Sequence, residues 1–322
     1  MHIWQPTAQF STLQYRAHIL SKIRQFFSER QVLEVETPLL ATSSVTDPHL
    51  QSFSTHYYDA TGQFMQTLYL QTSPEFCMKR LLAAGSGPIY QITRAFRNNG
   101  ESGRWHNPEF TMLEWYRPGF TLTALMDEAE ILLQTLLDCP AAQRFSYTEI
   151  FQQAFALNPH QASLSQLEQV ATQYDMSQTA TLMRREDWLQ LLLDHIVRQP
   201  RYAQHPLFVY DFPAAQAALA RIRSEDPPVA ERVEIYLAGL ELANGFHELA
   251  DAQEQRQRFL ADLAQRQDWG LALPPLDEKL LTALTRGLPD CSGIALGVDR
   301  LIALATQATA LAEVISFPID RV

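Results

Sequence analysis

Residues 94–116 read RAFRNNGESGRWHNPEFTMLEWY and predict more of the fold and the chemistry than any other stretch of the chain. A polar loop with glycines separates two segments that can form strands, which is typical of a strand–loop–strand hairpin. Such a hairpin can place the Arg97 guanidinium against a phosphate and the ring of Phe110 against a purine. Along the second strand the side chains alternate, so that one face receives Phe110, Met112, Glu114 and Tyr116, and the other receives Thr111, Leu113 and Trp115.

Length and composition indicate a globular protein with a large buried core. The 322 residues are enough for one large domain or two smaller ones, and 46% of them are hydrophobic. No apolar run approaches the roughly 18–20 residues of a membrane span, and the first residues lack the pattern of a secretory signal. The three cysteines are widely spaced and form no CxxC pair, which favours reduced thiols in a cytoplasmic protein over a zinc site or disulfides.

The formal net charge of −11 bears on the partners of the protein. A protein that binds nucleic acid over a wide surface usually carries a basic domain or stripe, and none is visible in this sequence. We therefore expect no stable tRNA binding, although a local basic patch can coexist with an acidic total.

The order of predicted elements favours an α+β fold in which helices flank an antiparallel β-sheet. Apolar spacing of three and four residues predicts helices, and short apolar or alternating runs predict strands. Residues 146–200 are mostly helical in pattern, which indicates a helical insertion at about 146–205 within a single domain that spans residues 1–322. The predicted helices cover residues 12–30, 75–84, 121–138 and 251–268, and the predicted strands cover 32–40, 89–92, 206–213 and 232–246.

The opening stretch resembles motif 2 of the class II aminoacyl-tRNA synthetases, and most closely that of lysyl-tRNA synthetase. The resemblance implies that Arg97 stabilises the charge that builds on the α-phosphate of ATP when a carboxylate attacks it, because the guanidinium fork matches phosphoryl oxygens. It also implies that Phe110 stacks on adenine. The other ATP contacts that it implies come from Asn98, Asn99, His106 and Asn107, with Arg104 beside the outer phosphates. The alternative is a surface hairpin with an ion-paired arginine.

One position departs from the family pattern. The family usually reads Phe-Arg-x-Glu, whereas this chain reads Phe96-Arg97-Asn98-Asn99. The Asn99 amide can form hydrogen bonds but brings no charge. Glu101 could substitute for the missing carboxylate, and both possibilities stay open.

Two further segments resemble the other class II motifs. VLEVETPLL, residues 32–40, ends a helix–strand–proline stretch like motif 1, which implies a homodimer. CSGIALGVDRLIALA, residues 291–305, resembles motif 3, where Gly293 and Gly297 permit close backbone approach to a nucleotide. The resemblance places Arg300 against the ATP phosphates, opposite Arg97, so that these two arginines are the candidate catalytic residues.

Carboxylates at three places indicate a basic amino acid as the substrate, because ammonium groups lose their hydration only where negative charge replaces it. The resemblance implies that Glu75, Tyr116 and Glu248 hold the amino acid. Glu241 is the candidate ligand of Mg²⁺ on ATP, with Glu248 as a second ligand. Ser73, Pro74, Asn244 and Ala295 complete the candidate substrate residues, and Leu242 and Gly297 complete those for ATP. The alternatives are a helix start for Glu75 and surface charges for the other two glutamates.

The resemblance extends over nearly the whole chain, yet two features differ from lysyl-tRNA synthetases. The class II pattern begins almost at the N-terminus, which leaves no space for an anticodon-binding barrel. Motif 3 reads Gly293-Ile294-Ala295-Leu296-Gly297 in place of Gly-x-Gly-x-Gly, and one methyl group in a packed pocket changes selectivity by about 1–3 kcal/mol.

With PEFTMLEWYRP and ELANGFHEL, these features resemble the elongation factor P–(R)-β-lysine ligase family. The resemblance implies that ATP activates (R)-β-lysine or lysine as its adenylate, and that the acyl group passes to a lysine ε-amine of elongation factor P. Three alternatives stay open: a compact synthetase that charges tRNA, a catalytically inactive regulator, and an amide-forming ligase such as an ammonia-using asparagine synthetase. Asn99 favours the regulator, whereas the three glutamates disfavour the asparagine enzyme.

Overall fold

The computed structural model describes residues 4–98, 103–176 and 184–322, and the chain divides into two compact units. The first unit contains Met1–Gly119 and Ala250–Val322, and the second contains Phe120–Leu249. Asn99 and Glu101, the two candidates for the acidic contact of motif 2, lie outside the described residues.

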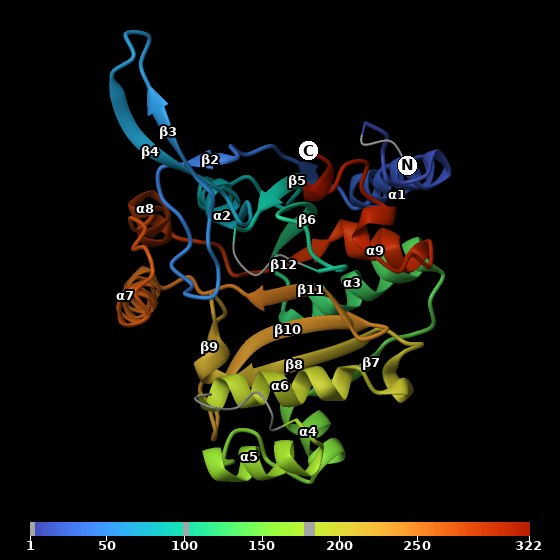
Figure 1. Cartoon of the computed structure of the whole chain (residues 1–322). Coiled ribbons are helices and arrows are strands. Elements are labelled where there is room, and N and C mark those ends of the chain that lie inside the picture. The colour runs from blue at the N-terminus through green and yellow to red at the C-terminus, as the bar shows by residue number, and fades with distance from the viewer. Residues whose placement is uncertain (1–3, 99–102, 177–183) are drawn as a thin grey trace. The chain divides into compact units, whose positions relative to one another are not determined.

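The first unit contains the strands of motifs 2 and 3, which lie next to each other (Figure 1). β5 and β6 form the predicted antiparallel hairpin, and β12 pairs with β6 in the antiparallel sense. The edge strand β1 runs parallel to its neighbour β5. In spatial order these strands are β1 (Leu33–Glu34), β5 (Ile89–Phe96), β6 (Glu109–Pro118) and β12 (Cys291–Gly297).

Helix α1 (Phe10–Glu29) packs against one face of these strands. Ile19, Ile23 and Phe27 follow helical spacing and are buried. The ring of Phe27 stacks on Tyr90 at 4.5 Å between centroids and lies 5.4 Å from Trp115. Because Trp115 alternates with Glu114 along β6, this apolar contact leaves the Glu114 face for other side chains.

The first unit also contains further α-helices and a small antiparallel sheet. The small sheet has the order β2 (Leu40–Ala41), β4 (Phe64–Leu70) and β3 (Ser54–Tyr58). The sequence analysis did not predict the β3–β4 hairpin, because its side chains are mostly exposed and show no apolar face. The helices are α2 (Glu75–Ala83), α7 (Ala252–Asp268), α8 (Glu278–Arg286) and α9 (Val298–Ala305), with 3-10 turns at Leu311–Glu313 and Ile319–Arg321.

The second unit has its own strands and helices. β11 (Leu240–His247), β10 (Val229–Leu237), β8 (Leu207–Pro213) and β7 (Gln143–Ser146) follow in this spatial order, and β9 (Ile222–Arg223) also pairs with β10. The pairs of β10 with β11, β8 and β9 are antiparallel, and β7 runs parallel to β8. The α-helices are α3 (Leu122–Leu137), α4 (Tyr147–Phe155), α5 (Leu164–Gln173) and α6 (Arg185–Val197), with 3-10 turns at Pro200–Tyr202 and Ala214–Gln216.

The predicted helical region is α4, α5 and α6, whose apolar side chains share one core. Phe151, Trp188 and Leu192 from these helices are buried together with Val209 and Phe212 from β8. The region therefore has a structural role in the second unit. A single domain that spans the whole chain, with this region as an insertion, stays a prediction.

Two strand predictions were wrong in detail. Residues 32–40 form only the short β1 and the start of β2, because Pro38 lacks the N–H that a continuous ladder needs. Residues 232–246 belong to two strands, and the turn between them uses Ala238 and Gly239 at φ values of 51° and 75°. Two successive positive φ values are typical of a tight hairpin turn.

The α+β fold class is confirmed, with mostly antiparallel strands and helices packed against them. Helices 75–84, 121–138 and 251–268 agree with α2, α3 and α7 within two residues at each end. Within the three described ranges, no helix is both long and apolar enough to cross a membrane.

Candidate active site

The register of the first unit places the predicted face of β6 beside motif 3. Glu114 pairs with Ala295 of β12, and Tyr116 pairs with Gly293. Directly opposite residues of an antiparallel pair project to the same face. The Ala295 methyl therefore lies next to the Glu114 carboxylate, while Gly293 leaves space beside the Tyr116 ring.

A buried carboxylate lies at the centre of this face. Tyr116 Oη donates a hydrogen bond to Glu114 Oε1 at 2.6 Å, and Ser73 Oγ donates to Glu114 Oε2 at 2.9 Å. Glu114 is only 2% exposed. Ser73 also accepts a hydrogen bond from the backbone N–H of Glu75 at 3.0 Å, which joins the start of α2 to β6. Ser73, Glu75 and Tyr116, three predicted substrate residues, thus meet around Glu114.

Burial raises the pKa of the Glu114 carboxyl to about 8, and repulsion by Glu75 adds to this rise. The two hydrogen bonds and the Lys79 ammonium oppose it. Lys79 is itself buried and donates to Glu75 Oε1 at 2.6 Å. The cluster therefore contains two carboxyl groups and one ammonium group, and it favours a protonated Glu114 until further positive charge arrives.

Sequence patterns did not identify Glu114 or Lys79 as site residues. Glu114 lies on the predicted face of Phe110 and Tyr116, and a carboxylate on this otherwise apolar face is the signal that could have identified it. Lys79 follows Glu75 by four residues, and side chains at this spacing meet on one face of a helix.

Two predicted ATP-binding residues, Arg97 and Phe110, also lie together. The Arg97 guanidinium lies over the Phe110 ring, with its central carbon 5.1 Å from the ring centroid. The Arg97 backbone N–H donates to the Pro108 carbonyl at 2.9 Å, and the N–H of Asn98 donates to the Gln51 carbonyl at 2.8 Å. The guanidinium and the aromatic ring are thus adjacent, which suits a nucleotide that contacts both. Their contacts with ATP stay predictions.

Arg300 reaches the end of the motif 2 loop. β12 ends at Gly297, which precedes the first residue of α9, and Arg300 lies in the first turn of that helix. Its Nη2 donates to His106 Nε2 at 2.9 Å, and its Nε donates to the Trp105 carbonyl at 3.3 Å. Because a guanidinium only donates, His106 Nε2 accepts in this arrangement.

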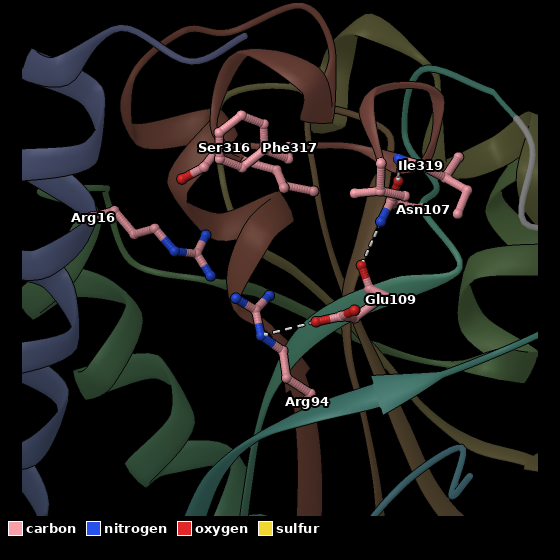
Figure 2. A pocket seen from close by; sticks show the side chains of 9 residues that line it. Arg16, Arg94, Asn107, Glu109, Ser316, Phe317 and Ile319 are labelled. Carbon is pink, nitrogen blue, oxygen red and sulfur yellow. Dashed lines mark hydrogen bonds and ion pairs between the residues drawn. The ribbon is translucent and has the colours of Figure 1, made fainter. Parts of the chain in front are cut away.

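Asn107 has structural partners for both ends of its side-chain amide. Nδ2 donates to the Glu109 carbonyl at 2.6 Å, and Oδ1 accepts from the Ile319 backbone N–H at 2.9 Å. Asn107 is 6% exposed, and Figure 2 shows it between Glu109 and Ile319. It joins the C-terminal turn to the start of β6, and its predicted ATP contact would use the second N–H of Nδ2 or the second lone pair of Oδ1.

The candidates of the second unit lie along β11. The pairing of β10 with β11 shifts between Ile235 and Tyr236, so that Glu241 pairs with Tyr236 and Asn244 pairs with Glu234. This bulge places Glu241 on the same face as Asn244, which strict alternation would not do. Asn244 Oδ1 accepts from Arg232 Nε at 3.2 Å.

The predicted Mg²⁺ ligands lie toward the two ends of β11. Glu241 is the second residue of that strand, and Glu248 directly follows its last residue. Their joint binding of one ion stays a prediction. Across the hairpin Glu241 pairs with Tyr236, whose hydroxyl donates a hydrogen bond to Glu234 on the same strand, β10. Among the described residues, no group of three or more acidic, His or Cys side chains could hold a metal ion.

The sequence was compared with known proteins. Residues 2–321 match the family of class II tRNA synthetases of the D, K and N type. A curated relative is the elongation factor P–(R)-β-lysine ligase of Edwardsiella ictaluri (strain 93-146), which is 53% identical over 322 residues. These residues cover 100% of this chain and 99% of that protein.

Proposed function

This chain belongs to the class II tRNA synthetases of the D, K and N type, and we propose that it is the ligase that attaches (R)-β-lysine to elongation factor P. It activates the amino acid with ATP and transfers the acyl group to the protein. The single observation that carries the proposal best is the buried Glu114 carboxyl between Tyr116 and Ser73, next to Glu75.

The cluster suits an amino acid with two ammonium groups. Without substrate, burial keeps the pKa of Glu114 high, because the ionised form has lost its hydration. A substrate ammonium group restores the charge balance, so Glu114 ionises and accepts a hydrogen bond from it. The neutral side chain of an amino acid such as leucine or phenylalanine brings no ammonium group to this cluster, so Glu114 stays protonated and forms no ion pair with it, which disfavours such substrates.

In the first step, a carboxylate oxygen of the amino acid attacks the α-phosphorus of ATP. The bond from the α-phosphorus to the bridging oxygen breaks, and pyrophosphate leaves with both electrons. We assign Arg97 and Arg300 to the negative charge on the phosphoryl oxygens, because a fixed guanidinium binds them in a bidentate manner.

In the second step, the acceptor amine attacks the activated carbonyl. The new amide bond forms while the carbonyl–phosphate bond breaks, and AMP leaves. The proposed acceptor is a lysine ε-amine of elongation factor P. No general base has been assigned, and correct positioning of the two reactants can supply much of the rate.

The donor set suits Mg²⁺ bound together with ATP. Magnesium commonly takes one or two carboxylates, with phosphate oxygens and water as the other ligands. Glu241 would hold the ion, which neutralises charge on the phosphates. Glu248 is the proposed second ligand of the ion and also a proposed contact of the amino acid.

The proposal includes a homodimer formed through the motif 1 segment and no stable complex with tRNA. The exposed side chains of Leu33, Leu39 and Leu40 in that segment support the dimer, because apolar groups at such a place gain from burial against a second copy. Light scattering after gel filtration would measure the mass in solution.

The direct test is the intact mass of elongation factor P after incubation with this protein, ATP and each lysine isomer. We expect one added lysyl group, with (R)-β-lysine giving the fastest reaction. Parallel incubations contain labelled amino acid and tRNA, and a matched set uses the Arg300→Ala variant. Stable label on tRNA with unchanged elongation factor P would contradict the proposal.

A further inference from the structure

A buried aspartate behind the ATP residues joins three motifs of the first unit. Asp299 is 2% exposed and lies in the first turn of α9, directly before Arg300. Its Oδ2 accepts a hydrogen bond from the backbone N–H of Thr111 at 2.7 Å, and its Oδ1 pairs with Arg16 Nη1 at 2.5 Å. Thr111 directly follows Phe110, so this carboxylate touches the backbone beside both the stacking ring and the motif 3 arginine.

The hydrogen bond from Thr111 continues the strand pairing where β12 ends. Gly297 pairs with Met112, and the same register would place residue 298 opposite Thr111. The chain turns into α9 at Val298 instead, so the pairing of β12 with β6 ends before Thr111. The Asp299 carboxylate accepts its N–H and thereby fixes the start of α9 against β6.

Arg16 connects helix α1 to the same point. One nitrogen of its guanidinium contacts Asp299, while Nη2 donates to Thr111 Oγ1 at 2.6 Å. Its side chain is 14% exposed. Arg94 donates to the same hydroxyl at 3.0 Å, but it is 45% exposed and its ion pair is with Glu109. The guanidinium groups of Arg16 and Arg94 point toward one another at a cavity of about 170 Å³ (Figure 2).

We propose that Arg16 and Asp299 are positioning residues that hold Phe110 and Arg300 at the correct distance for ATP. The proposal rests on the proposed function, which assigns those two residues to the nucleotide. The Arg16 guanidinium joins two elements to α1. These are β6, which carries Phe110, and α9, which carries Arg300. Misplacement of a binding group by about 1 Å can reduce a rate 100-fold, so this fixation affects ATP far more than the amino acid.

The test compares ATP and lysine binding in three variants and a control. The variants are Arg16→Met, Asp299→Asn, and the double variant with both changes. Arg24→Met is the matched control, because Arg24 lies on the same helix but forms an exposed pair with Glu34. Calorimetry measures the affinities for a non-hydrolysable ATP analogue with Mg²⁺ and for lysine, and urea unfolding measures the stability of each variant.

We expect Arg16→Met to reduce affinity for the ATP analogue about tenfold or more, with lysine affinity changed less than about twofold. The double variant removes both buried charges, while the amide oxygen that Asp299→Asn introduces still accepts from Thr111, so it regains most of the lost stability. Its affinity for the ATP analogue stays low, because the connection from α1 is still missing. This variant decides the question if Arg16→Met alone does not fold.

Four results would overturn the inference. ATP affinity could return with stability in the double variant, or the ATP and lysine affinities could fall by the same factor, and either result indicates a merely structural pair. Equal losses in Arg24→Met would show that any change in α1 has this effect. A wild-type chain that binds lysine and no nucleotide would overturn the proposed function and this inference with it.

Discussion

The carboxylate cluster around Glu114 and the arginine pair for ATP lie in the same unit but differ in construction. Glu114, Tyr116 and Lys79 of the cluster are buried, and the regular elements β6 and α2 carry its charged side chains. Arg97 lies just after a strand, and Arg300 contacts residues of the motif 2 loop. With the proposed roles, the amino-acid site is assembled before its ligand arrives, whereas ATP would replace the protein contacts of Arg300 with its own.

The largest effect that this comparison predicts is at the arginine pair. Arg300→Ala should reduce pyrophosphate exchange by about 10³-fold or more, because the lost charge acts mainly on the transition state. Lysine affinity, measured by calorimetry, should remain close to wild type. Arg24→Ala is the control, because Arg24 lies on α1 and forms an exposed ion pair with Glu34. A loss of lysine affinity equal to the loss of exchange would remove the distinction between the two regions.

The next effect concerns the cluster. Glu114→Gln should raise the KM for the amino acid about 10- to 100-fold, since a hydrogen bond to a charged group contributes about 1.5–3 kcal/mol. The KM for ATP should change little. Steady-state pyrophosphate exchange at varied amino acid and varied ATP measures both values. An equal increase in the two KM values would indicate general damage to the unit.

The pH dependence sharpens the same point. The pKa of Glu114 is raised by burial, so the carboxyl is mostly protonated near neutral pH in the free protein and ionises as the pH rises toward 8. The ionised form binds an ammonium group, so kcat/KM for the amino acid should increase from pH 6 to pH 8, by up to about tenfold per pH unit. Glu114→Gln should remove this pH dependence of kcat/KM. A dependence that persists in that variant would come from another titrating group.

The same raised pKa has a consequence for stability. A carboxyl with a higher pKa in the folded state contributes stability that is present below its unfolded pKa and is lost as the pH rises through its folded pKa. The free energy of unfolding of the substrate-free protein should therefore fall between about pH 5 and pH 8, relative to Glu114→Gln. Urea unfolding at both pH values measures this difference. The absence of this difference would mean that Glu114 is ionised throughout this pH range.

The smallest effect is at Ser73. Ser73→Ala removes one hydrogen bond to Glu114 and the acceptor for the Glu75 N–H. We expect about a fivefold rise in the KM for the amino acid, which corresponds to about 1 kcal/mol for one hydrogen bond. The exposed Ser54→Ala change in β3 is the control. A larger effect than that of Glu114→Gln would place Ser73, and not the carboxyl, at the centre of the cluster.

The sequence predicted the features that depend on local periodicity. The alternation from Phe110 to Tyr116 gave the correct face of β6, because a shift by one residue would move every side chain of that strand to the other face. Sequence patterns did not predict the contact of Asn107 with Ile319, because 212 residues separate the two in the chain. The face of Glu241 was equally hidden, since a bulge changes the alternation of its hairpin.

Proton release on lysine binding tests the central claim most directly. Calorimetry at pH 7 in two buffers of different ionisation enthalpy gives the number of protons that leave the protein. If Glu114 is neutral in the free protein and ionises against the substrate ammonium group, wild type should release close to one proton and Glu114→Gln none. Lysine binding without proton release in the wild-type protein would contradict the account.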